Sequence, residues 1–325
     1  MSATSSQPRF VPGRYAAIDI GTVTCRLLVA DVDAQGAITE LAHAYEVVNL
    51  GEGVDVSRQL KPEAIERVAR AVEGYQETLA QVGEGPYGPA KVFAVATSAS
   101  RDARNADEFR RRMEDIGIVP QVIPGEREAA LSFSGASAGF EGSHVVVVDV
   151  GGGSTEIVAG LAGEGENTVA RSFDIGCRRV TERFFLDDPP TETQIDDARM
   201  WMRDQFVPHF QMLRENGLLA DATMVAVAGT ATSVVSMREH MEVYDAQRVH
   251  HAVVTREDVD ATIDWLAPMT LAERENIVGL DPRRAPVILA GVLVLQEVME
   301  AGGFSAYTAS ESDILQGIVL DQARA

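Results

Sequence analysis

The chain has 325 residues, 46% of them hydrophobic and 24% charged, with a formal net charge of −21. This length predicts two domains, because a single hydrophobic core stops growing at about 250–300 residues. The acidic balance argues against a broad nucleic-acid-binding face, which needs clustered Lys and Arg, and the two cysteines, Cys25 and Cys177, exclude a disulfide framework.

The N-terminal stretch MSATSSQPRFVPGRY has neither the basic region nor the apolar region of a secretory signal. We expect residues 1–14 to form a disordered leader. The longest apolar run, at 285–295, is shorter than the roughly 20 residues that span a bilayer. Together with the few cysteines, these features predict a cytoplasmic protein without membrane or nucleic-acid partners.

A duplication is the strongest internal signal in the chain. The stretches YAAIDIGTVTCRLLVADV at 15–32 and VVVVDVGGGSTEIVAGLA at 145–162 follow one plan: an apolar strand, an Asp, a Gly turn with small hydroxyl residues, and a second apolar strand. The copies begin about 130 residues apart, which is a domain length rather than a solenoid period. The sequence therefore predicts two copies of one domain.

Strands and helices alternate along the rest of the chain, which predicts an α/β fold. Strands are predicted at 91–97, 121–123 and 223–228. Helices are predicted at 61–81, 105–116, 126–138, 191–216, 230–241, 254–267, 286–301 and 311–322. The Gly- and Glu-rich stretches at 83–89 and 163–167 are predicted to be hairpin or linker tips.

The two glycine loops predict anion sites that differ from the familiar nucleotide loops. A P-loop needs a Lys and a following helix, and a dinucleotide turn also needs a helix, whereas the apolar, β-branched TEIVAGLA predicts a strand. A strand–turn–strand hairpin offers backbone N–H groups and hydroxyls to an anion. Here they come from Gly21, Thr22, Thr24, Gly151, Gly152, Gly153, Ser154 and Thr155.

Asp19 and Asp149 end the first strand of each copy, where they would repel an anion unless they hold a divalent cation. For either loop alone, a tight hairpin with an acidic turn residue is an equal alternative. A third turn, Gly229-Thr230, opens a helix whose N-terminal N–H groups can bind an anion. Taken alone, Thr230 is also explained as an ordinary N-cap.

These three elements together resemble the actin, Hsp70 and sugar-kinase superfamily. The resemblance implies an α/β protein of two RNase H-like domains with the active site in the cleft between them. On this basis we expect the first domain at 15–125 plus 308–325 and the second at 126–307.

The remaining motifs narrow the resemblance. ATSASRDARN places Arg101 and Asn105 four residues apart, which predicts one helical face, and GEREA places Glu128 in the first turn of a helix. IGCRRVTERF and LDPRRAPVILAG carry Arg179 and Arg284. From about residue 15 to residue 320, this ordered set resembles the exopolyphosphatase/guanosine pentaphosphate phosphohydrolase family, in its short two-domain form.

The resemblance implies metal-dependent hydrolysis of the terminal phosphoanhydride of inorganic polyphosphate. The alternative substrate is guanosine pentaphosphate, which would give the tetraphosphate. Glu128 matches the family's catalytic base, and Asp149 and Glu156 match carboxylates that help to hold Mg²⁺ (or Mn²⁺) or the water. Asp19 would join the metal site, and no organic cofactor is expected. The phosphate would be bound by the glycine loops together with Arg26, Arg101, Asn105, Arg179 and Arg284. The family also suggests a homodimer.

Two other classes of protein stay open. A small-molecule kinase of the same superfamily is disfavoured by Glu128, and a non-enzymatic actin-like domain is disfavoured by the intact acids. Without the resemblance, Glu128 is also explained as a first-turn acid favoured by the helix dipole. The chain departs from the family pattern at Val23, Asn49, Arg127 and Leu315, which bears on chain-length and nucleotide preference.

Overall fold

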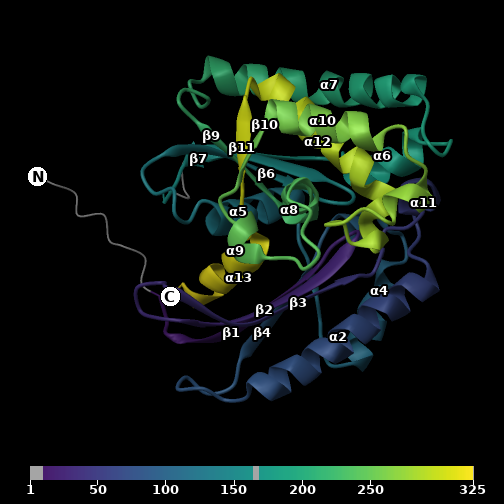
Figure 1. Cartoon of the computed structure of the whole chain (residues 1–325). Coiled ribbons are helices and arrows are strands. Elements are labelled where there is room, and N and C mark those ends of the chain that lie inside the picture. The colour runs from purple at the N-terminus through teal and green to yellow at the C-terminus, as the bar shows by residue number, and fades with distance from the viewer. Residues whose placement is uncertain (1–9, 164–167, 325) are drawn as a thin grey trace, which may run out of the picture.

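Two mixed β-sheets form the framework of the molecule (Figure 1). The computed structural model describes residues 10–163 and 168–324. The first sheet has the order β3-β2-β1-β4-β5 and the second the order β10-β11-β9-β6-β7-β8. The strands are β1 (Gly13–Ile20), β2 (Thr24–Val32), β3 (Ile38–Val47), β4 (Lys91–Ala96), β5 (Gln121–Val122), β6 (His144–Val150), β7 (Thr155–Leu161), β8 (Val169–Phe173), β9 (Thr223–Val227), β10 (Val253–Thr255) and β11 (Ala306–Ala309).

The two sheets share one topology. Three antiparallel strands, β1-β2-β3 or β6-β7-β8, are extended on the side of the first strand by parallel strands, β4-β5 or β9-β11. The strand β10 adds an antiparallel edge to the second sheet. The predicted duplication and the two RNase H-like α/β domains are therefore confirmed.

Helices form layers outside and between the sheets (Figure 1). The outer layer of the first sheet is α2 (Pro62–Val82) and α4 (Ala106–Asp115), and that of the second is α6 (Cys177–Phe184), α7 (Glu192–Glu215), α8 (Ala228–Arg238), α10 (Arg256–Leu266) and α12 (Ala285–Gly302). Between the sheets lie α5 (Gly125–Ala136) and α13 (Ile314–Ala323). The short helices are α1 (Val54–Ser57), α3 (Ser98–Asp102), α9 (Ala246–Val249) and α11 (Leu271–Arg274).

The strand β6 shows why its sequence is apolar throughout. Val146, Val148 and Val150 belong to the core under the outer helices, whereas Val145 and Val147 pack toward α5. Both faces of the strand are buried, so its residues do not alternate between apolar and polar.

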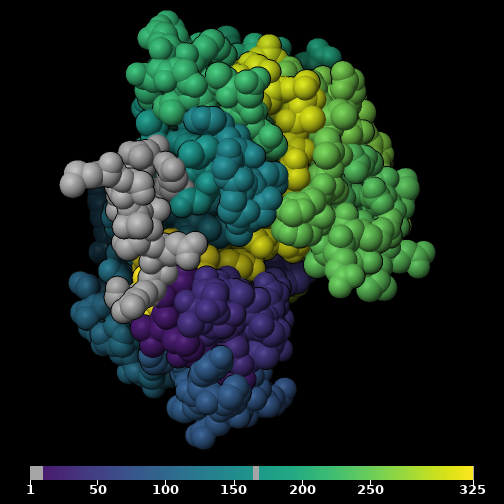
Figure 2. Space-filling view, turned by 90° about the vertical axis from the view of Figure 1, so that its left-hand side faces the viewer, coloured from purple at the N-terminus to yellow at the C-terminus, as the bar shows by residue number. Residues whose placement is uncertain are grey.

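Two glycines allow the helices between the sheets to cross in contact. A Cβ atom at Gly317 of α13 would lie 2.0 Å from the carbonyl oxygen of Leu131 in α5, and one at Gly135 would lie 1.8 Å from the carbonyl oxygen of Asp313. The helix α5 follows β5 of the first sheet, and α13 follows β11 of the second. In Figure 2 the C-terminal segment, in yellow, runs through the upper part of the molecule and reaches the junction with the purple N-terminal part.

The apolar stretch near the C-terminus is a core helix. By length and composition, the segment Pro282–Gly302 could cross a membrane. However, 72% of its apolar stretch is buried inside the protein. Its Leu289, Leu293 and Val294 belong to the core of the second domain. Burial on all sides explains this composition without a bilayer.

A cluster of charged contacts joins α6 of the second domain to α1 and α3 of the first. Arg179 of α6 donates to the carbonyl oxygen of Gly153 (2.8 Å) and pairs with Asp55 of α1 and, at 2.5 Å, with Asp102 of α3. Arg183 of α6 also pairs with Asp55, at 3.0 Å. The second domain is thus clamped to the first through α6.

The structure corrects several local expectations. Arg101 and Asn105 do not share a helical face, because α3 ends at Asp102 and Ala103 is extended. The predicted leader is too long: Phe10 pairs with Arg324 and β1 begins at Gly13. Residues 1–9 of that leader, and 164–167 of the predicted loop at 163–167, lie outside the described residues.

The predicted helices at 254–267 and 311–322 begin later than expected. The first follows β10, and the second begins at Ile314, after Asp313 caps its N-terminus. The strand β11 pairs with β9 of the second sheet, whereas α13 packs on β1 and β2 of the first.

Gly317→Ala is expected to lower the free energy of unfolding by about 3 kcal/mol or more, because the new methyl group would force α5 and α13 apart. Thermal and denaturant unfolding of the purified protein measure this change. The control is Gly74→Ala in the exposed part of α2, where a Cβ meets nothing within 4 Å. It is expected to stabilise by about 0.5–1 kcal/mol. Equal effects of the two substitutions would contradict the crossing as a constraint.

Arg179→Ala is expected to destabilise the protein by about 1–3 kcal/mol, because it removes the buried guanidinium that joins the half-buried carboxylates of Asp55 and Asp102. Arg183→Ala is the matched control, since Arg183 pairs with the same Asp55 but has a 38% exposed side chain. Its loss should cost about 1 kcal/mol or less. Urea titration of both variants measures the change in the free energy of unfolding. A change for Arg179→Ala as small as that for Arg183→Ala would contradict the role of Arg179 in holding the domains together.

Candidate active site

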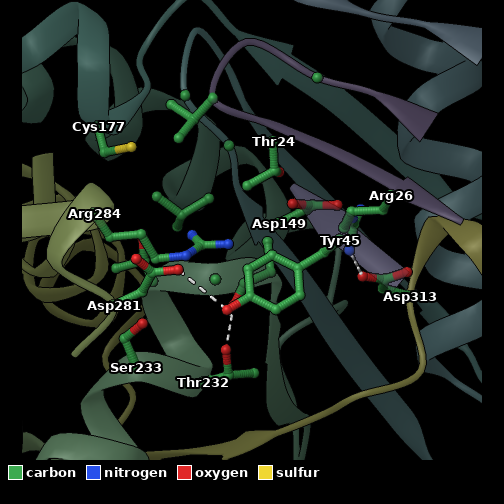
Figure 3. A pocket seen from close by; sticks show the side chains of 18 of the residues that line it. Thr24, Arg26, Tyr45, Asp149, Cys177, Thr232, Ser233, Asp281, Arg284 and Asp313 are labelled. Atoms are coloured by element: carbon green, nitrogen blue, oxygen red, sulfur yellow. Dashed lines mark hydrogen bonds and ion pairs between the residues drawn. The ribbon is translucent and has the colours of Figure 1, made fainter. Parts of the chain in front are cut away.

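A cavity of about 470 Å³ lies in the cleft between the two sheets (Figure 3). Both glycine hairpins, the start of α8 and the loop before α12 contribute to its walls. Most of the predicted site residues line it. They are Asp19, Gly21, Thr22, Thr24, Arg26, Glu128, Asp149, Gly151, Gly152, Gly153, Ser154, Gly229, Thr230 and Arg284.

The tips of the two hairpins are in direct contact. A Cβ atom on Gly152 would lie 2.9 Å from Cβ of Thr22, and one on Gly153 would lie 2.9 Å from Oγ1 of Thr22. Glycine is therefore required for the close approach. Among the described residues, the backbone N–H groups of Gly152 and Gly153 have no protein acceptor. They are free to bind an anion in the cavity.

The paired aspartates occupy equivalent positions in the two domains. Asp19 accepts from Arg26 at 2.7 Å through one oxygen, while its other oxygen, Oδ1, is buried without a partner. Asp149 accepts from Oγ of Ser132 at 2.7 Å. Burial raises the pKa of Asp149 to about 6 and also raises the pKa of Asp19, although Arg26 opposes the rise. These carboxylates are oxygen donors of the kind that a hard divalent cation prefers.

Glu128 lies in the first turn of α5 with only 8% of its surface exposed. Its Oε2 accepts a hydrogen bond from Nη1 of Arg101 at 2.6 Å, and the same nitrogen donates to the carbonyl oxygen of Ile123 at 3.0 Å. Burial raises the pKa of Glu128 to about 7 against the opposing charge of Arg101. A carboxyl group with this pKa exchanges a proton readily near neutral pH.

Glu156 lies behind the cavity lining. It is 1% exposed and accepts from Oγ of Ser172 at 2.6 Å, while its Oε2 is buried without a partner. Burial and the neighbouring charge of Glu128 raise its pKa well above the usual range. Both effects favour the protonated form of Glu156.

Four other predicted residues have structural contacts outside the cavity lining. Arg101 holds Glu128, and Arg179 belongs to the clamp on α6. Asn105 bonds through its amide to the backbone N–H (2.8 Å) and carbonyl (3.0 Å) of Leu60. Thr155 donates to the carbonyl oxygen of Ile175 at 2.6 Å.

Arg284 lines the cavity, and its guanidinium is available to bind an anion. Its guanidinium lies against Gly229, where a Cβ would come within 1.7 Å of Nη1, at the start of α8. Among the described residues it has no hydrogen bond or ion pair, and burial lowers its pKa. A helix N-terminus and a guanidinium are both positive, so together they favour an anion between them.

Some residues of the cavity had no part in the predicted site. Asp313 caps α13 and forms an ion pair with Arg26 (Figure 3), and Tyr45 and Asp281 line the cavity from opposite domains. The sequence signal for Asp313 is its position before an apolar helix, in a capping box with Gln316. Nothing in the sequence around Tyr45 or Asp281 indicates that they meet.

The cavity has an excess of negative charge. Its carboxylates are Asp19, Glu128, Asp149, Glu242, Asp281, Glu311 and Asp313. Among the described residues that line the cavity, only Arg26, Arg284 and His43 are basic, and Arg26 is already paired. In the part of the chain that the structure describes, no three His, Cys, Asp or Glu side chains form a ready metal cage. The partnerless oxygen of Asp19 and the carboxylate of Asp149, which line the same cavity, nevertheless fit a cation that keeps most of its water.

Comparison with known proteins places this geometry in a family. The chain is 39% identical over 325 residues to Exopolyphosphatase 2 of Mycobacterium tuberculosis, covering 95% of this chain and 98% of that protein. The crystal structure of an exopolyphosphatase-like protein matches with 33% identity and a TM-score of 0.83, over 96% and 98% of the two chains. An exopolyphosphatase from Cytophaga hutchinsonii matches with 25% identity and a TM-score of 0.81, over 96% and 99%.

A family model also matches most of the chain. The Ppx/GppA phosphatase family matches residues 28–324, which include the second hairpin, Glu128, the Gly229 turn and Arg284. The first strand, the first turn and the start of β2 lie just before the matched range, but they repeat the plan of the second hairpin and contribute to the same cavity. The chain belongs to the Ppx/GppA phosphatase family, in its short two-domain form.

Proposed function

We propose that this protein is an exopolyphosphatase, which hydrolyses the terminal phosphoanhydride of inorganic polyphosphate and releases phosphate. The observation that carries the proposal is Glu128, a buried carboxylate held by Arg101 in a cavity that both glycine hairpins line. The similarity to Exopolyphosphatase 2 over nearly the whole chain supports this choice of substrate.

Glu128 is the proposed base. Its carboxylate accepts a proton from a water molecule, whose oxygen forms a bond to the terminal phosphorus. The bond from that phosphorus to the bridging oxygen breaks, and the electron pair leaves with the shortened chain. Arg101 keeps one carboxylate oxygen of Glu128 in place at 2.6 Å, which leaves the other oxygen for the water.

The terminal phosphate would be held from both domains. The free N–H groups of Gly152 and Gly153 and the guanidinium of Arg284 supply donors from the second domain, and the hydroxyl groups of Thr22 and Thr24 supply donors from the first. Oγ of Thr22 is buried without a partner, so it can donate to an added phosphate. This grip positions the phosphorus between the two hairpins, close to the aspartates.

Asp19 and Asp149 would hold Mg²⁺, or Mn²⁺ in its place. When bound, such a cation neutralises charge on the phosphate oxygens. The cavity needs this compensation, because its carboxylates outnumber its basic side chains. Glu156 lies behind the cavity lining and would join this site through its partnerless Oε2, while its Oε1 stays bonded to Ser172.

Guanosine pentaphosphate is the second candidate substrate, because its terminal phosphoanhydride is chemically the same. The observation in its favour is Tyr244, an aromatic side chain that lines the cavity and could stack on a base. Its hydroxyl group donates to Glu311.

The direct test measures phosphate release by the purified protein from short polyphosphate, long polyphosphate, guanosine pentaphosphate and ATP side by side. With Mg²⁺, we expect the highest kcat/KM on a polyphosphate, and loss of activity when a chelator removes the metal. Asp19→Asn should weaken the response to Mg²⁺, because it removes one of two anionic ligands.

Three results would contradict parts of this proposal. Preference for guanosine pentaphosphate would move the protein to the second candidate. Phosphate transfer from ATP to a small acceptor would indicate a kinase. Full turnover in the presence of chelator would remove the metal from the reaction and leave Asp19 as a turn residue.

Glu128→Gln is expected to lower kcat by at least about a hundredfold, the usual contribution of a general base. In the wild type, kcat/KM should fall as the pH drops below about 7, because protonation of Glu128 removes the base. Steady-state kinetics between pH 5 and pH 9 measure both effects. The matched control is Glu126→Gln, an exposed acid in the same helical turn. A normal rate for Glu128→Gln would exclude Glu128 as the base.

A further inference from the structure

A bridge of four side chains joins the two domains beside the cavity. Oη of Tyr45 donates to Oδ2 of Asp281 at 3.1 Å, and Arg283 pairs with Glu46 at 2.8 Å and with Asp281 at 2.9 Å. Tyr45 and Glu46 belong to β3, the edge strand of the first sheet, while Asp281 and Arg283 precede α12 of the second domain. We call these four residues the mouth bridge.

The mouth bridge stands where the cavity meets solvent. Tyr45 and Asp281 line the cavity, yet Tyr45 is 46% exposed, and about half of each of the Arg283 and Glu46 side chains is exposed. In Figure 3 the ring of Tyr45 lies across the cavity and its hydroxyl group points toward Asp281. One side of the bridge therefore lines the cavity, and the other side is exposed to solvent.

The register of the first sheet gives the distance from the hairpins to this bridge. Asp19, Arg26 and Tyr45 are direct neighbours on β1, β2 and β3. Two strand spacings separate Asp19 from Tyr45, which is about 10 Å. A phosphate chain held at Asp19 can thus extend only a short way before it meets the tyrosine ring.

The charge of the outer cavity also disfavours a long chain. Glu242, Asp281 and Glu311 line it, and Arg284 and His43 are the only basic side chains in that lining besides the paired Arg26. Arg283, the cation of the bridge, is occupied by two carboxylates. A long polyanion that left the cavity here would meet carboxylates instead of a basic track.

We propose that the mouth bridge determines which chain lengths the cavity accepts. Short phosphate chains fit behind the bridge, and a long chain is bound only when the contacts of Tyr45 and Arg283 break and these side chains move aside. This inference rests on the proposed action on polyphosphate. Tyr45, Asp281, Arg283 and Glu46 are then residues that determine specificity, and none of them touches the reacting phosphorus.

The test compares kcat/KM for a long-chain polyphosphate with kcat/KM for tripolyphosphate, counted per chain end. The wild type should favour tripolyphosphate. The double variant Tyr45→Ala/Arg283→Ala removes the ring and the cation, and should raise the long-to-short ratio by about tenfold or more. Tyr45→Phe keeps the ring and loses one hydrogen bond, so it should raise the ratio by only about twofold to tenfold.

Arg110→Ala is the matched control, because Arg110 lies in an exposed pair with Glu114 on α4 and its loss changes the net charge by the same amount. Its ratio should equal that of the wild type. An unchanged ratio in the double variant, or a wild type without preference for the short chain, would overturn the proposal while leaving the hydrolysis of polyphosphate intact. If the wild type cleaves neither chain, the proposed function fails, and this inference fails with it.

Discussion

The crossing of α5 and α13 is the constraint on which the rest of the structure depends. The helices touch through Gly135 and Gly317, where any side chain would collide with backbone carbonyl oxygens. Each helix begins with an acid that lines the cavity, Glu128 in the first turn of α5 and Asp313 at the cap of α13. Because the helices cannot separate, Glu128 and Asp313, the partner of Arg26, are held in one cavity between the domains.

The electrostatics of the cavity follow from the burial of acids at this junction. Asp19, Asp149 and Glu128 are removed from water, which raises the pKa of each, and Arg26, Arg101 and the hydroxyl group of Ser132 oppose the rise. Such a cluster is costly unless something offsets its charge. A divalent cation would compensate the pair of aspartates, and the raised pKa of Glu128 suits it to accept a proton near neutral pH.

The arginines show how far a sequence motif can be interpreted. Arg101, Arg179 and Arg284 all follow the family pattern, and phosphate binding was the expectation for each. In the structure Arg101 holds Glu128, Arg179 is occupied by Asp55 and Asp102, and Arg284 has no protein partner among the described residues. Only the third is free to meet an anion. A guanidinium binds carboxylate and phosphate with the same geometry. The sequence motif therefore does not determine whether an arginine pairs with a carboxylate of the protein or binds a phosphate.

By itself, the sequence determined the duplicated hairpins, the α/β class, the family and the position of Glu128, because each depends on residues close together in the chain or on an ordered set of motifs. Strand–glycine–strand patterns and first-turn acids are local, and local geometry follows from local residues. Tertiary structure alone decided the partner of each arginine, the hidden place of Glu156 behind the lining, and the contact of Tyr45 with Asp281. Those two residues lie 236 positions apart. Their hydrogen bond exists because the packing of the two domains brings the edge strand β3 next to the segment before α12, a relation that no short stretch of sequence contains.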